Sequence, residues 1–537
     1  MKSIKLTTIF TLFAAFMAEA QQREAVTTNS FPAHQKIAYA ERIIESYYLD
    51  DVDGDTLAEE AIKAMLLTLD PHSTYSDPEE TKEMTQPLDG NFSGIGIQFN
   101  MLNDTLFVIQ TTAGGPSEKV GILAGDKIIS ANGIQLSGVK KANSDVIKTL
   151  RGPKGTEVNL EVLRRGVAEP ISFRLNRDDI PINSLDAAFM ADQTTGFIKL
   201  SRFAESTEKE FADAVKKLKA QGMKQLIIDL EDNGGGYLGS AVEVSSHLLS
   251  KGDLVTYTES PKLGQQEYRL ERNGDMTNIP VVIMVNQYSA SASEILSGAV
   301  QDNDRGLIVG RRTFGKGLVQ RPFPFPDGSM IKLTVSRYHT PSGRSIQKPY
   351  EAGHADDYRK DMLTRYENGE FTSAENISFP DSLKYTTLKN KRTVYGGGGI
   401  MPDLFVPVDT TAYSDYYRDL VAKGVLNSFC ITYVDNNRTQ LHAQYPDEQS
   451  FIDNFVVTPE IMNGILNRGV KEGVEKNDEQ YQRSREMMQV IVKALIGRDL
   501  FEQETYYRIA LPALNPTYQA ALHLINDPVR FYQLLNP

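Results

Sequence analysis

The sequence predicts a multidomain α+β protein, because blocks with helical and with strand periodicity follow one another along a long chain. With 537 residues, the chain exceeds what one hydrophobic core organises. Apolar residues recur at helical spacing from 35 to 85, and short strand-like segments between glycine-rich turns extend to 177. From 180 to 409 strands and helices alternate, as in a sheet flanked by helices, and the remainder has a helical pattern.

These changes of pattern divide the chain into a helical N-terminal domain at 21–88, a β-rich domain at 89–177, an α/β core at 178–409 and a helical C-terminal extension at 410–537. In the β-rich domain we expect strands at 106–109, 127–129 and 158–162 and a helix at 143–150. In the core we expect strands at 195–200, 224–230, 281–285 and 307–309, with helices at 208–220 and 238–249.

The first twenty residues, 1–20, have the features of a signal peptide. Lys2 and Lys5 precede an apolar run from Ile9 to Met17, and Ala18-Glu19-Ala20 fits a small-x-small cleavage site. The alternative, a membrane anchor, needs about 20 apolar residues, which is more than this run provides. We therefore expect an exported, periplasmic protein that is cleaved near Ala20, with peripheral membrane association left open.

Composition narrows the classes of partner. Hydrophobic residues make up 40% of the chain and charged residues 24%, which is ordinary for globular protein, and the formal net charge is −13. An acidic chain repels nucleic acid and anionic membrane, so neither is expected as a partner. Cys430 is the only cysteine, so no intrachain disulfide can form, and we expect it to be a small buried hydrophobe rather than a nucleophile.

A serine-rich turn lies between the apolar strand at 281–285 and a predicted helix. The run Ser289-Ala290-Ser291-Ala292-Ser293 is made of small residues, which let a substrate approach the backbone closely. The amides and dipole at the start of the helix favour negative charge, so a serine there lies beside ready-made oxyanion donors. Taken alone, the run also fits an ordinary serine helix cap.

A lysine downstream is a candidate general base. Lys316 lies between Gly315 and Gly317, after the apolar strand at 307–309, and a lone lysine is otherwise a solvated surface charge. To act as a base near neutrality, its pKa must fall from about 10.4 towards 7–8, and burial without a nearby carboxylate is the usual means. Gln320 can orient the amine through a neutral amide. No histidine lies between His247 and His339, and we read His72 as a turn residue.

Together, Ser289–Glu294, Gln301-Asp302 and Thr313-Phe314-Gly315-Lys316-Gly317 with Val319-Gln320 resemble the motifs of the carboxyl-terminal processing proteases, also called tail-specific proteases. The resemblance covers about 35–409 and implies a crotonase-like α/β protease core preceded by a PDZ domain. It implies Ser291 as nucleophile, Lys316 as general base and Gln320 as its support. It further implies an oxyanion hole made by the amides of Ala292 and of a glycine in the run 234–236, Gly236 first and Gly235 as the alternative.

The PDZ-like region is identified from Gly90–Ile97, Gly125–Ile129 and Arg151–Thr156. A PDZ domain binds a peptide C-terminus as an added strand, with loop amides holding the carboxylate. The segment expected to do this is Ser93-Gly94-Ile95-Gly96-Ile97, and the alternative is a plain strand with core isoleucines. The expected substrates are C-terminal tails of exported proteins, and an adaptor or activator protein and a homo-oligomer are left open as partners.

The sequence departs from the family pattern at two places. Glu231 stands where the family usually has arginine, and an insert at 350–396 separates motifs that many relatives join almost directly. The predicted reaction is peptide-bond hydrolysis through an acyl-enzyme, and no metal or organic cofactor is implied. A catalytically inactive peptide-binding scaffold, which Glu231 alone favours, and an esterase on small acyl substrates are the alternatives.

Overall fold

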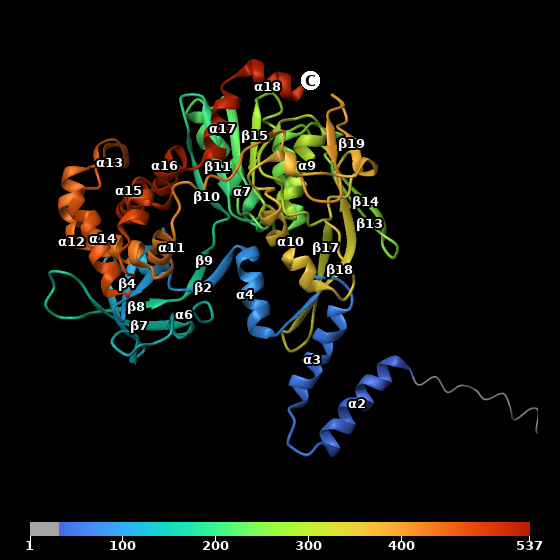
Figure 1. Ribbon diagram of the computed structural model, residues 1–537. Helices are drawn as coiled ribbons and strands as arrows, with labels where there is room; N and C mark the ends of the chain where they lie inside the picture. Colours follow the sequence, from blue (N-terminus) through green and yellow to red (C-terminus); the bar gives the residue numbers. More distant parts are fainter. Residues whose placement is uncertain (1–31) are drawn as a thin grey trace, which may run out of the picture. The chain divides into compact units, whose positions relative to one another are not determined.

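A computed structural model describes residues 32–537 and confirms the predicted fold class (Figure 1). The predicted signal peptide at 1–20 lies outside the described residues. The chain divides into two compact units, one ending at Leu69 and the other running from Asp70 to Pro537. Across residues 32–537, no helix has both the length and the apolar character needed to cross a membrane.

The first unit is helical where it is described. It contains α2 (Ala33–Tyr47) and α3 (Gly54–Leu67), which are joined by a short connection. Asp53 caps α3 by accepting a hydrogen bond from the amide of Asp55, as the preference for aspartate at this position predicts. α2 has no buried side chain, although Ile37 and Ile44 lie on it at helical spacing.

The second unit begins with β1 and α4 and continues into the PDZ-like domain. α4 starts with a capping box between Asp77 and Glu80 and a proline at its first position. The domain's main sheet has the order β3-β4-β5-β7-β8, with β6 paired to β5, so β3 lies at its edge, and a separate pair joins β2 to β9. The elements of this region are β1 (Thr74–Ser76), α4 (Pro78–Asp89), β2 (Asn91–Gly94), β3 (Ile97–Leu102), β4 (Thr105–Thr111), α5 (Pro116–Lys119), β5 (Lys127–Ala131), β6 (Ile134–Gln135), α6 (Asn143–Leu150), β7 (Glu157–Leu163), β8 (Ile171–Asn176) and β9 (Asp178–Pro181).

A six-stranded sheet of order β10-β11-β12-β15-β16-β21 forms the centre of the core, parallel except for the β10–β11 pair. Its strands and crossover helices are β10 (Leu185–Met190), β11 (Thr195–Leu200), α7 (Thr207–Ala220), β12 (Gln225–Asp229), α8 (Leu238–Leu248), β15 (Val281–Val285), α9 (Ala292–Asp302), β16 (Leu307–Gly310) and β21 (Leu404–Phe405). β15 and β16 are buried along their whole length, which explains their continuous apolar runs.

A second sheet lies beside it, with the order β1-β18-β13-β14 and with β17 paired to β18. The insert adds α10, two short 3-10 turns and a two-stranded pair. The remaining elements of this part are β13 (Leu254–Ser260), β14 (Gly264–Arg269), β17 (Leu318–Pro324), β18 (Met330–His339), α10 (Ala355–Glu367), η1 (Ala374–Asn376), η2 (Asp381–Leu383), β19 (Lys384–Thr386) and β20 (Thr393–Tyr395).

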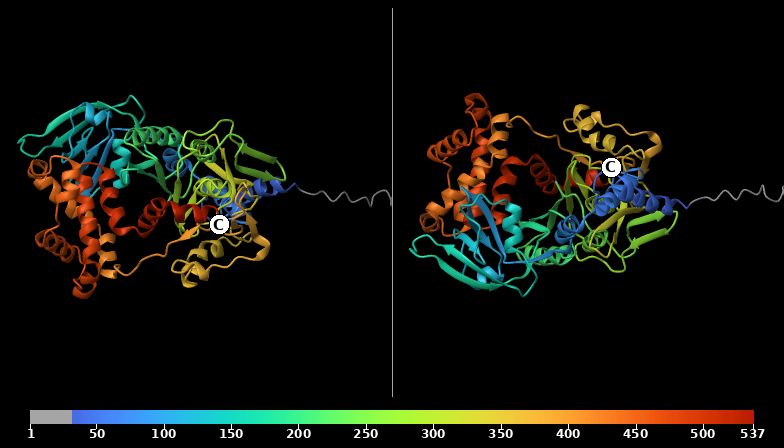
Figure 2. Two further views of the ribbon diagram at one scale, coloured as in Figure 1. Left: turned by 90° about the horizontal axis from the view of Figure 1, so that it is seen from above. Right: turned by 90° about the horizontal axis from the view of Figure 1, so that it is seen from below.

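The C-terminal extension is helical, as predicted, and its helices have two different surroundings. The helices are α11 (Asp415–Ala422), α12 (Val425–Gln444), α13 (Glu448–Asn454), α14 (Pro459–Lys471), α15 (Asp478–Leu500), α16 (Gln503–Leu514), α17 (Pro516–Ile525) and α18 (Pro528–Leu535). α11 to α15 pack largely among themselves around buried Cys430, in a cluster that the first turns of α16 also join. By contrast, α17 and α18 lie over the six-stranded sheet (Figures 1 and 2).

The two faces of the central sheet are therefore covered by distant parts of the chain. Ile198, Ile228 and Ile283 pack against α7, α8 and α9 on one face. Phe197 and Ile227 point to the other face, where they meet Leu511 and residues of α17 and α18. Because apolar strands alternate their side chains between faces, both faces need a cover, and the extension provides the second one.

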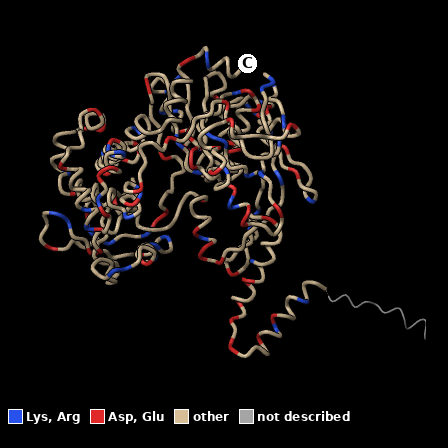
Figure 3. Tube along the Cα trace, in the orientation of Figure 1, with Lys and Arg blue, Asp and Glu red and all other residues tan. Residues whose placement is uncertain are grey.

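Charges of both signs are interspersed along the described chain (Figure 3). The whole sequence has 57 basic and 70 acidic residues, so both signs are abundant although acidic residues are in excess.

Candidate active site

The predicted catalytic residues come from loops that follow neighbouring parallel strands. The glycine run 234–236 follows β12, Ser291 follows β15, and Lys316 follows β16. The carboxyl ends of parallel strands meet at one edge of a sheet, so the three loops converge there. Gly235, Gly236, Ser291, Lys316 and Gln320 all line one cavity of about 390 Å³.

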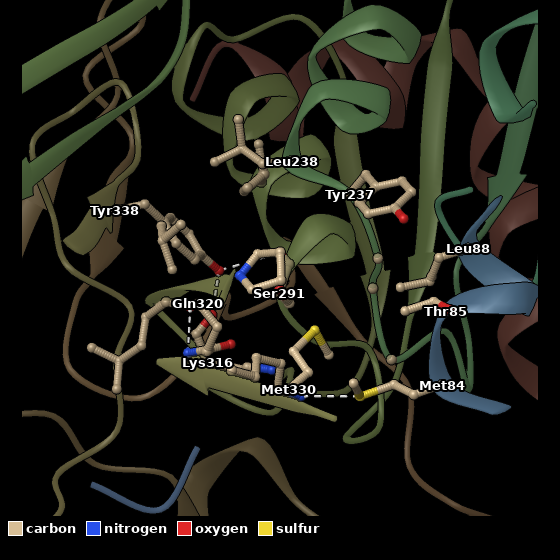
Figure 4. A pocket seen from close by; sticks show the side chains of 18 residues that line it. Met84, Thr85, Leu88, Tyr237, Leu238, Ser291, Lys316, Gln320, Met330 and Tyr338 are labelled. Carbon is tan, nitrogen blue, oxygen red and sulfur yellow. Dashed lines mark hydrogen bonds between the residues drawn. The ribbon is translucent and has the colours of Figure 1, made fainter. Parts of the chain in front are cut away.

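The walls of this cavity are mostly apolar. In Figure 4, Met84, Thr85 and Leu88 of α4 lie across the cavity from Tyr338, with Ser291 and Lys316 between them. The other lining side chains come from the glycine loop, α9 and the second sheet: Tyr237, Leu238, Ile295, Leu318, Val319, Pro322, Met330 and Lys332. A cavity of this kind suits an apolar side chain of an extended peptide next to the reacting bond.

Ser291 has a backbone conformation that few residues other than glycine adopt. Its φ is 57° and its ψ is −115°, at the residue that caps α9. Such conformations cost of order 1–3 kcal/mol and persist only where the surroundings enforce them, as they often do at active sites. Ser291 is therefore held on a strained strand-to-helix turn at the cavity wall.

The neighbouring serines have a different role. The Ser289 hydroxyl donates to the Leu230 carbonyl at 2.7 Å, and the Ser293 hydroxyl donates to the Asn233 carbonyl at 2.9 Å. Both side chains are completely buried, and neither lines the cavity. They join the serine turn to the glycine loop, and of the run's three serines only Ser291 faces the cavity.

The glycine loop passes close to Ser291, and its Gly235 and Gly236 amides differ in their hydrogen bonding. A Cβ on Gly235 would lie 2.7 Å from Ser291 Cβ, and a Cβ on Gly236 would lie 2.0 Å from the Phe203 carbonyl oxygen, so neither position tolerates a side chain. The Gly235 amide donates to Asn233 Oδ1 at 2.9 Å. Within residues 32–537 the amides of Gly236 and Ala292 have no hydrogen-bond acceptor. This difference favours Gly236 over Gly235 as the second oxyanion donor.

Lys316 is enclosed by protein. Burial, and after it the charge of Lys332, lowers the pKa of Lys316 from 10.5 to about 8, against the opposing effects of Glu294 and Asp70. No hydrogen bond joins the Lys316 amine to the Ser291 hydroxyl in the described part of the chain. Their backbones are linked instead, since the Tyr338 hydroxyl lies 2.5 Å from the Lys316 carbonyl oxygen and 3.2 Å from that of Ser291.

Glu294 contributes to the site in a way that the sequence analysis missed. Its buried carboxylate accepts hydrogen bonds from the amides of Ser291, Gly315 and Lys316 and from the Thr313 hydroxyl. Burial raises the pKa of Glu294 to about 7, although all four donors favour the ionised form. A serine followed three residues later by glutamate is a capping-box pattern, which could have indicated the contact between Glu294 and Ser291. It could not have indicated the contacts of Glu294 to the turn that carries Lys316, which we call the base turn. A carboxylate therefore lies near the predicted base, contrary to the expectation of burial without one.

Gln320 and the turn from Asp70 to Ser73 belong to one hydrogen-bond network. Gln320 Nε2 donates to the Leu318 carbonyl at 3.1 Å and to Thr334 Oγ1 at 3.3 Å. Thr334 in turn donates to Asp70 Oδ1, and Asp70 also accepts from the Ser73 hydroxyl. His72 lies in this turn, as expected, and burial together with Lys316 lowers its pKa to about 4.

The insert holds the outer side of the base turn. Arg365 of α10 is buried and donates to the carbonyls of Thr313 and Arg312 at 3.1 and 2.8 Å. Just before the insert, the Lys348 amide donates to the Gly315 carbonyl at 2.9 Å. The turn that carries Lys316 is thus fixed from inside by Glu294 and from outside by α10.

The PDZ-like domain has its own small pocket of about 140 Å³ between the edge strand β3 and α6. Its lining consists of Phe92, Ile95, Gly96, Ile97, Phe99, Ile147, Leu150 and Arg151. Of the predicted peptide-binding residues, Ile95, Gly96 and Ile97 line it, whereas Ser93 and Gly94 pair with β9 instead. In the described chain the amides of Ile95 and Gly96 have no acceptor, as a carboxylate-binding loop requires.

Four family models match parts of the chain. Peptidase family S41 matches residues 194–359, and a PDZ domain matches residues 93–175. The N-terminal domain of the activating protease CtpB matches residues 10–81, and a family of unknown function matches residues 416–502, the region of α11 to α15.

Known proteins with similar sequences include carboxy-terminal processing proteases from several bacteria. The chain is 35% identical over 333 residues to a carboxy-terminal-processing protease of Bartonella bacilliformis, which covers 60% of this chain and 76% of that protein. It is 34% identical to the carboxy-terminal processing protease CtpA of Bacillus subtilis, with 65% and 75% of the two chains covered. A solved structure, the photosystem II D1 C-terminal processing protease, is 28% identical and covers 59% of this chain and 91% of its own, with a TM-score of 0.34.

Proposed function

Since this chain belongs to the carboxy-terminal processing proteases of peptidase family S41 and is a serine-type peptidase with a PDZ domain, we propose that it cleaves peptide bonds with a Ser291–Lys316 dyad. The observation that carries this assignment is the single cavity that Ser291, Lys316 and Gly236 share. In it, a strained serine faces a lysine whose pKa is lowered to about 8.

The acylation step follows from these groups. Neutral Lys316 accepts the proton of the Ser291 hydroxyl while Oγ attacks the carbonyl carbon of the scissile bond. The free amides of Ala292 and Gly236 stabilise the oxyanion that forms, an interaction whose loss costs about 3–4 kcal/mol in other proteases. Protonated Lys316 then donates to the leaving amine as the C–N bond breaks, which leaves the acyl-enzyme.

Deacylation uses the same groups in reverse roles. Water attacks the ester carbon while Lys316 accepts its proton, and the released Ser291 oxygen recovers that proton. The mostly apolar cavity favours an apolar substrate residue beside the scissile bond. Gln320 is proposed to support the lysine from β17.

The PDZ-like domain is proposed to select substrates by their free C-termini. The peptide would pair with edge strand β3, its carboxylate would bind the free amides of Ile95 and Gly96, and its last side chain would enter the pocket lined by Ile97 and Ile147. The substrates proposed are tails of exported proteins in the periplasm, reached after loss of residues 1–20. An activator or adaptor remains part of the proposal, in line with the N-terminal match to an activating protease.

The decisive experiment compares the three serines of the run. The mature protein is incubated with an unfolded substrate, and the products are mapped by mass spectrometry. Ser291→Ala is expected to abolish cleavage, whereas Ser289→Ala and Ser293→Ala retain it and lose only about 1–2 kcal/mol of stability, because each removes one buried hydroxyl donor from a carbonyl that keeps a backbone amide donor. Full cleavage by Ser291→Ala would falsify the assignment.

A further inference from the structure

Glu231, the residue at the family's usual arginine position, is buried among the catalytic loops. It lies in the loop after β12, shortly before the glycine run, and its side chain is 7% exposed. Glu231 Oε2 accepts a hydrogen bond from Asn515 Nδ2 at 2.7 Å, and Oε1 lies 3.5 Å from Arg311 Nη2. The carboxylate therefore joins the glycine loop to two other segments of the chain.

Arg311 extends this connection to the nucleophile loop. It follows β16 on the way to Lys316, and its Nε donates to Gln287 Oε1 at 2.9 Å. Gln287 lies between β15 and Ser291. A single guanidinium thus contacts both the loop that carries Gly236 and the loop that carries Ser291, while its own backbone leads to the base turn.

Asn515 belongs to the C-terminal extension and has both ends of its amide engaged. It connects α16 to α17, and its Oδ1 accepts from the Tyr518 amide at 2.9 Å to cap α17. This bond orients the side chain so that Nδ2 points to Glu231. α17 is itself anchored on the sheet, where Tyr518 and Leu524 pack in one cluster with Met284 of β15.

The charge of Glu231 depends on these partners. Burial raises the pKa of Glu231, the carboxylate of Asp229 raises it further, and Asn515, Arg311 and Lys199 oppose the shift. Lys199 donates to Asp229 Oδ2 at 2.9 Å and to the Glu231 carbonyl at 3.2 Å, and Asp232 lies next in the chain. A buried carboxylate that loses a donor pays the full desolvation cost, so the loop is expected to move when Asn515 is changed.

We propose that Asn515 and Glu231 are positioning residues for proteolysis, through which the C-terminal extension holds the glycine loop where the Gly236 amide faces the cavity beside Ser291. The inference rests on the proposed dyad mechanism. It assigns α16 and α17 to the catalytic machinery, although the S41 match ends at residue 359. Neither residue touches the reacting atoms; both act through the loop.

The test uses substitutions that preserve the helix cap. Asn515→Asp keeps an oxygen for the Tyr518 amide but turns a carboxylate towards Glu231. Asn526→Asp is the matched control, because Asn526 Nδ2 donates to Asp192 Oδ2 at 2.8 Å in the same extension, beside Gln225 at the opposite end of the strands. Each variant places two carboxylates opposite each other, the new aspartate with Glu231 in the first and with Asp192 in the second. Only the first pair lies beside the catalytic loops.

We expect Asn515→Asp to lower kcat at least about tenfold with KM within about twofold, because complete loss of an oxyanion donor costs roughly 10²–10³ in kcat. Lowering the pH towards 6 should recover part of the relative activity, since one of the two carboxylates then takes up a proton. Amide hydrogen exchange of the loop 230–237 should speed up in Asn515→Asp and not in Asn526→Asp.

The double variant Asn515→Asp with Glu231→Gln decides between positioning and general damage. In it, the new glutamine side chain can donate through Nε2 to the new aspartate while its Oε1 remains towards Arg311, so the donor and acceptor are exchanged. We expect kcat to recover at least fivefold over Asn515→Asp. Equal kcat in Asn515→Asp and Asn526→Asp, or no recovery in the double variant, overturns the inference. Wild-type cleavage with an inactive Ser291→Ala shows separately that the proposed function holds.

Discussion

Glu294 lies beneath the turn of Lys316 and accepts a hydrogen bond from the Lys316 amide at 2.9 Å with the same oxygen that accepts from the Ser291 amide at 2.8 Å. One carboxylate oxygen therefore sets the spacing between the nucleophile turn and the base turn. Its negative charge also opposes the fall in the pKa of Lys316, which burial nevertheless outweighs.

Glu294→Gln should separate these two effects. The amide nitrogen of glutamine cannot accept from backbone amides, so it faces either the amides of Ser291 and Lys316 or the amide of Gly315. In both orientations at least one buried amide loses its acceptor, and kcat should fall by about two orders of magnitude. The residual activity should reach its plateau at lower pH than in wild type, because loss of the negative charge lowers the pKa of Lys316 further. The measurement is kcat/KM against pH.

The matched control for this prediction is Glu243→Gln on the exposed side of α8, which should change neither quantity. An unchanged pH profile in Glu294→Gln, whatever its rate, would show that the carboxylate does not act on Lys316.

The insert supplies a second prediction through Arg365. Arg365→Met removes the donors to the carbonyls of Thr313 and Arg312 and leaves both without them, so the base turn should loosen. We expect kcat to fall about tenfold, together with a loss of about 2–4 kcal/mol of stability. Activity and thermal midpoint are both measured.

Arg359→Met on the same helix is the control for charge and helix propensity, because Arg359 forms an exposed ion pair with Asp356. It should leave activity within about twofold, since exposed pairs contribute little. If both arginine variants behaved alike, α10 would have no specific hold on the base turn.

The sequence was informative where function depends on short contiguous segments. Ser291 and Lys316 could be proposed together because their motifs jointly resemble those of one protease family. Each also follows an apolar strand, and parallel strands bring such turns together at one edge of a sheet. The contact from Asn515 to Glu231 could not be identified, because it joins positions separated by 284 residues. Likewise, nothing in the pattern of 503–535 reveals that these helices cover the second face of the central sheet; only the apolar strands imply that some cover exists.

Within the PDZ-like domain, only part of the segment predicted to bind peptide lies at the pocket, since Ile95, Gly96 and Ile97 line it. Ser93 and Gly94 have small side chains, as a binding loop needs, yet their backbone is used by the pairing of β2 with β9. Pairing partners that lie far apart in sequence are not visible in a local pattern.

Tail recognition predicts a difference between free and amidated substrates. The free amides of Ile95 and Gly96 can bind a carboxylate, whereas a C-terminal amide brings a donor to the same place. Amidation should raise KM or lower turnover several-fold, with the cleavage sites unchanged. Steady-state kinetics on a peptide pair that differs only at the terminus provides the measurement, and equal rates for both members would exclude recognition of the terminus by this loop.

Lys332 offers a test of the electrostatics around the base. It lines the same cavity from β18, and it lowers the pKa of Lys316. Lys332→Met should therefore raise the pKa of Lys316 and move the rise of kcat/KM to higher pH, opposite to the shift in Glu294→Gln. A shift in the same direction for both variants would contradict the proposed arrangement of charges.

The last prediction concerns Lys316 itself. With a pKa lowered to about 8, the pH profile of kcat/KM should rise through that value, well below the 10.5 of a free lysine, and Lys316→Arg should be inactive because arginine stays protonated.

The lowered pKa of Lys316 also predicts how the stability of the folded protein depends on pH. Below pH 8 the ammonium is charged in both the folded and the unfolded chain, and the folded chain bears the full cost of burying it, roughly 3 kcal/mol. Above about pH 10.5 the amine is neutral in both states and the cost disappears. Lys316→Met should therefore be inactive yet more stable than wild type at pH 7, and its advantage in the free energy of unfolding should shrink as the pH rises from 8 towards 10.5. Denaturant unfolding of both proteins across this range measures the difference. An advantage that is absent at pH 7, or that grows with pH, would mean that the folded protein does not disfavour the charged lysine, and Lys316 could then not serve as the base.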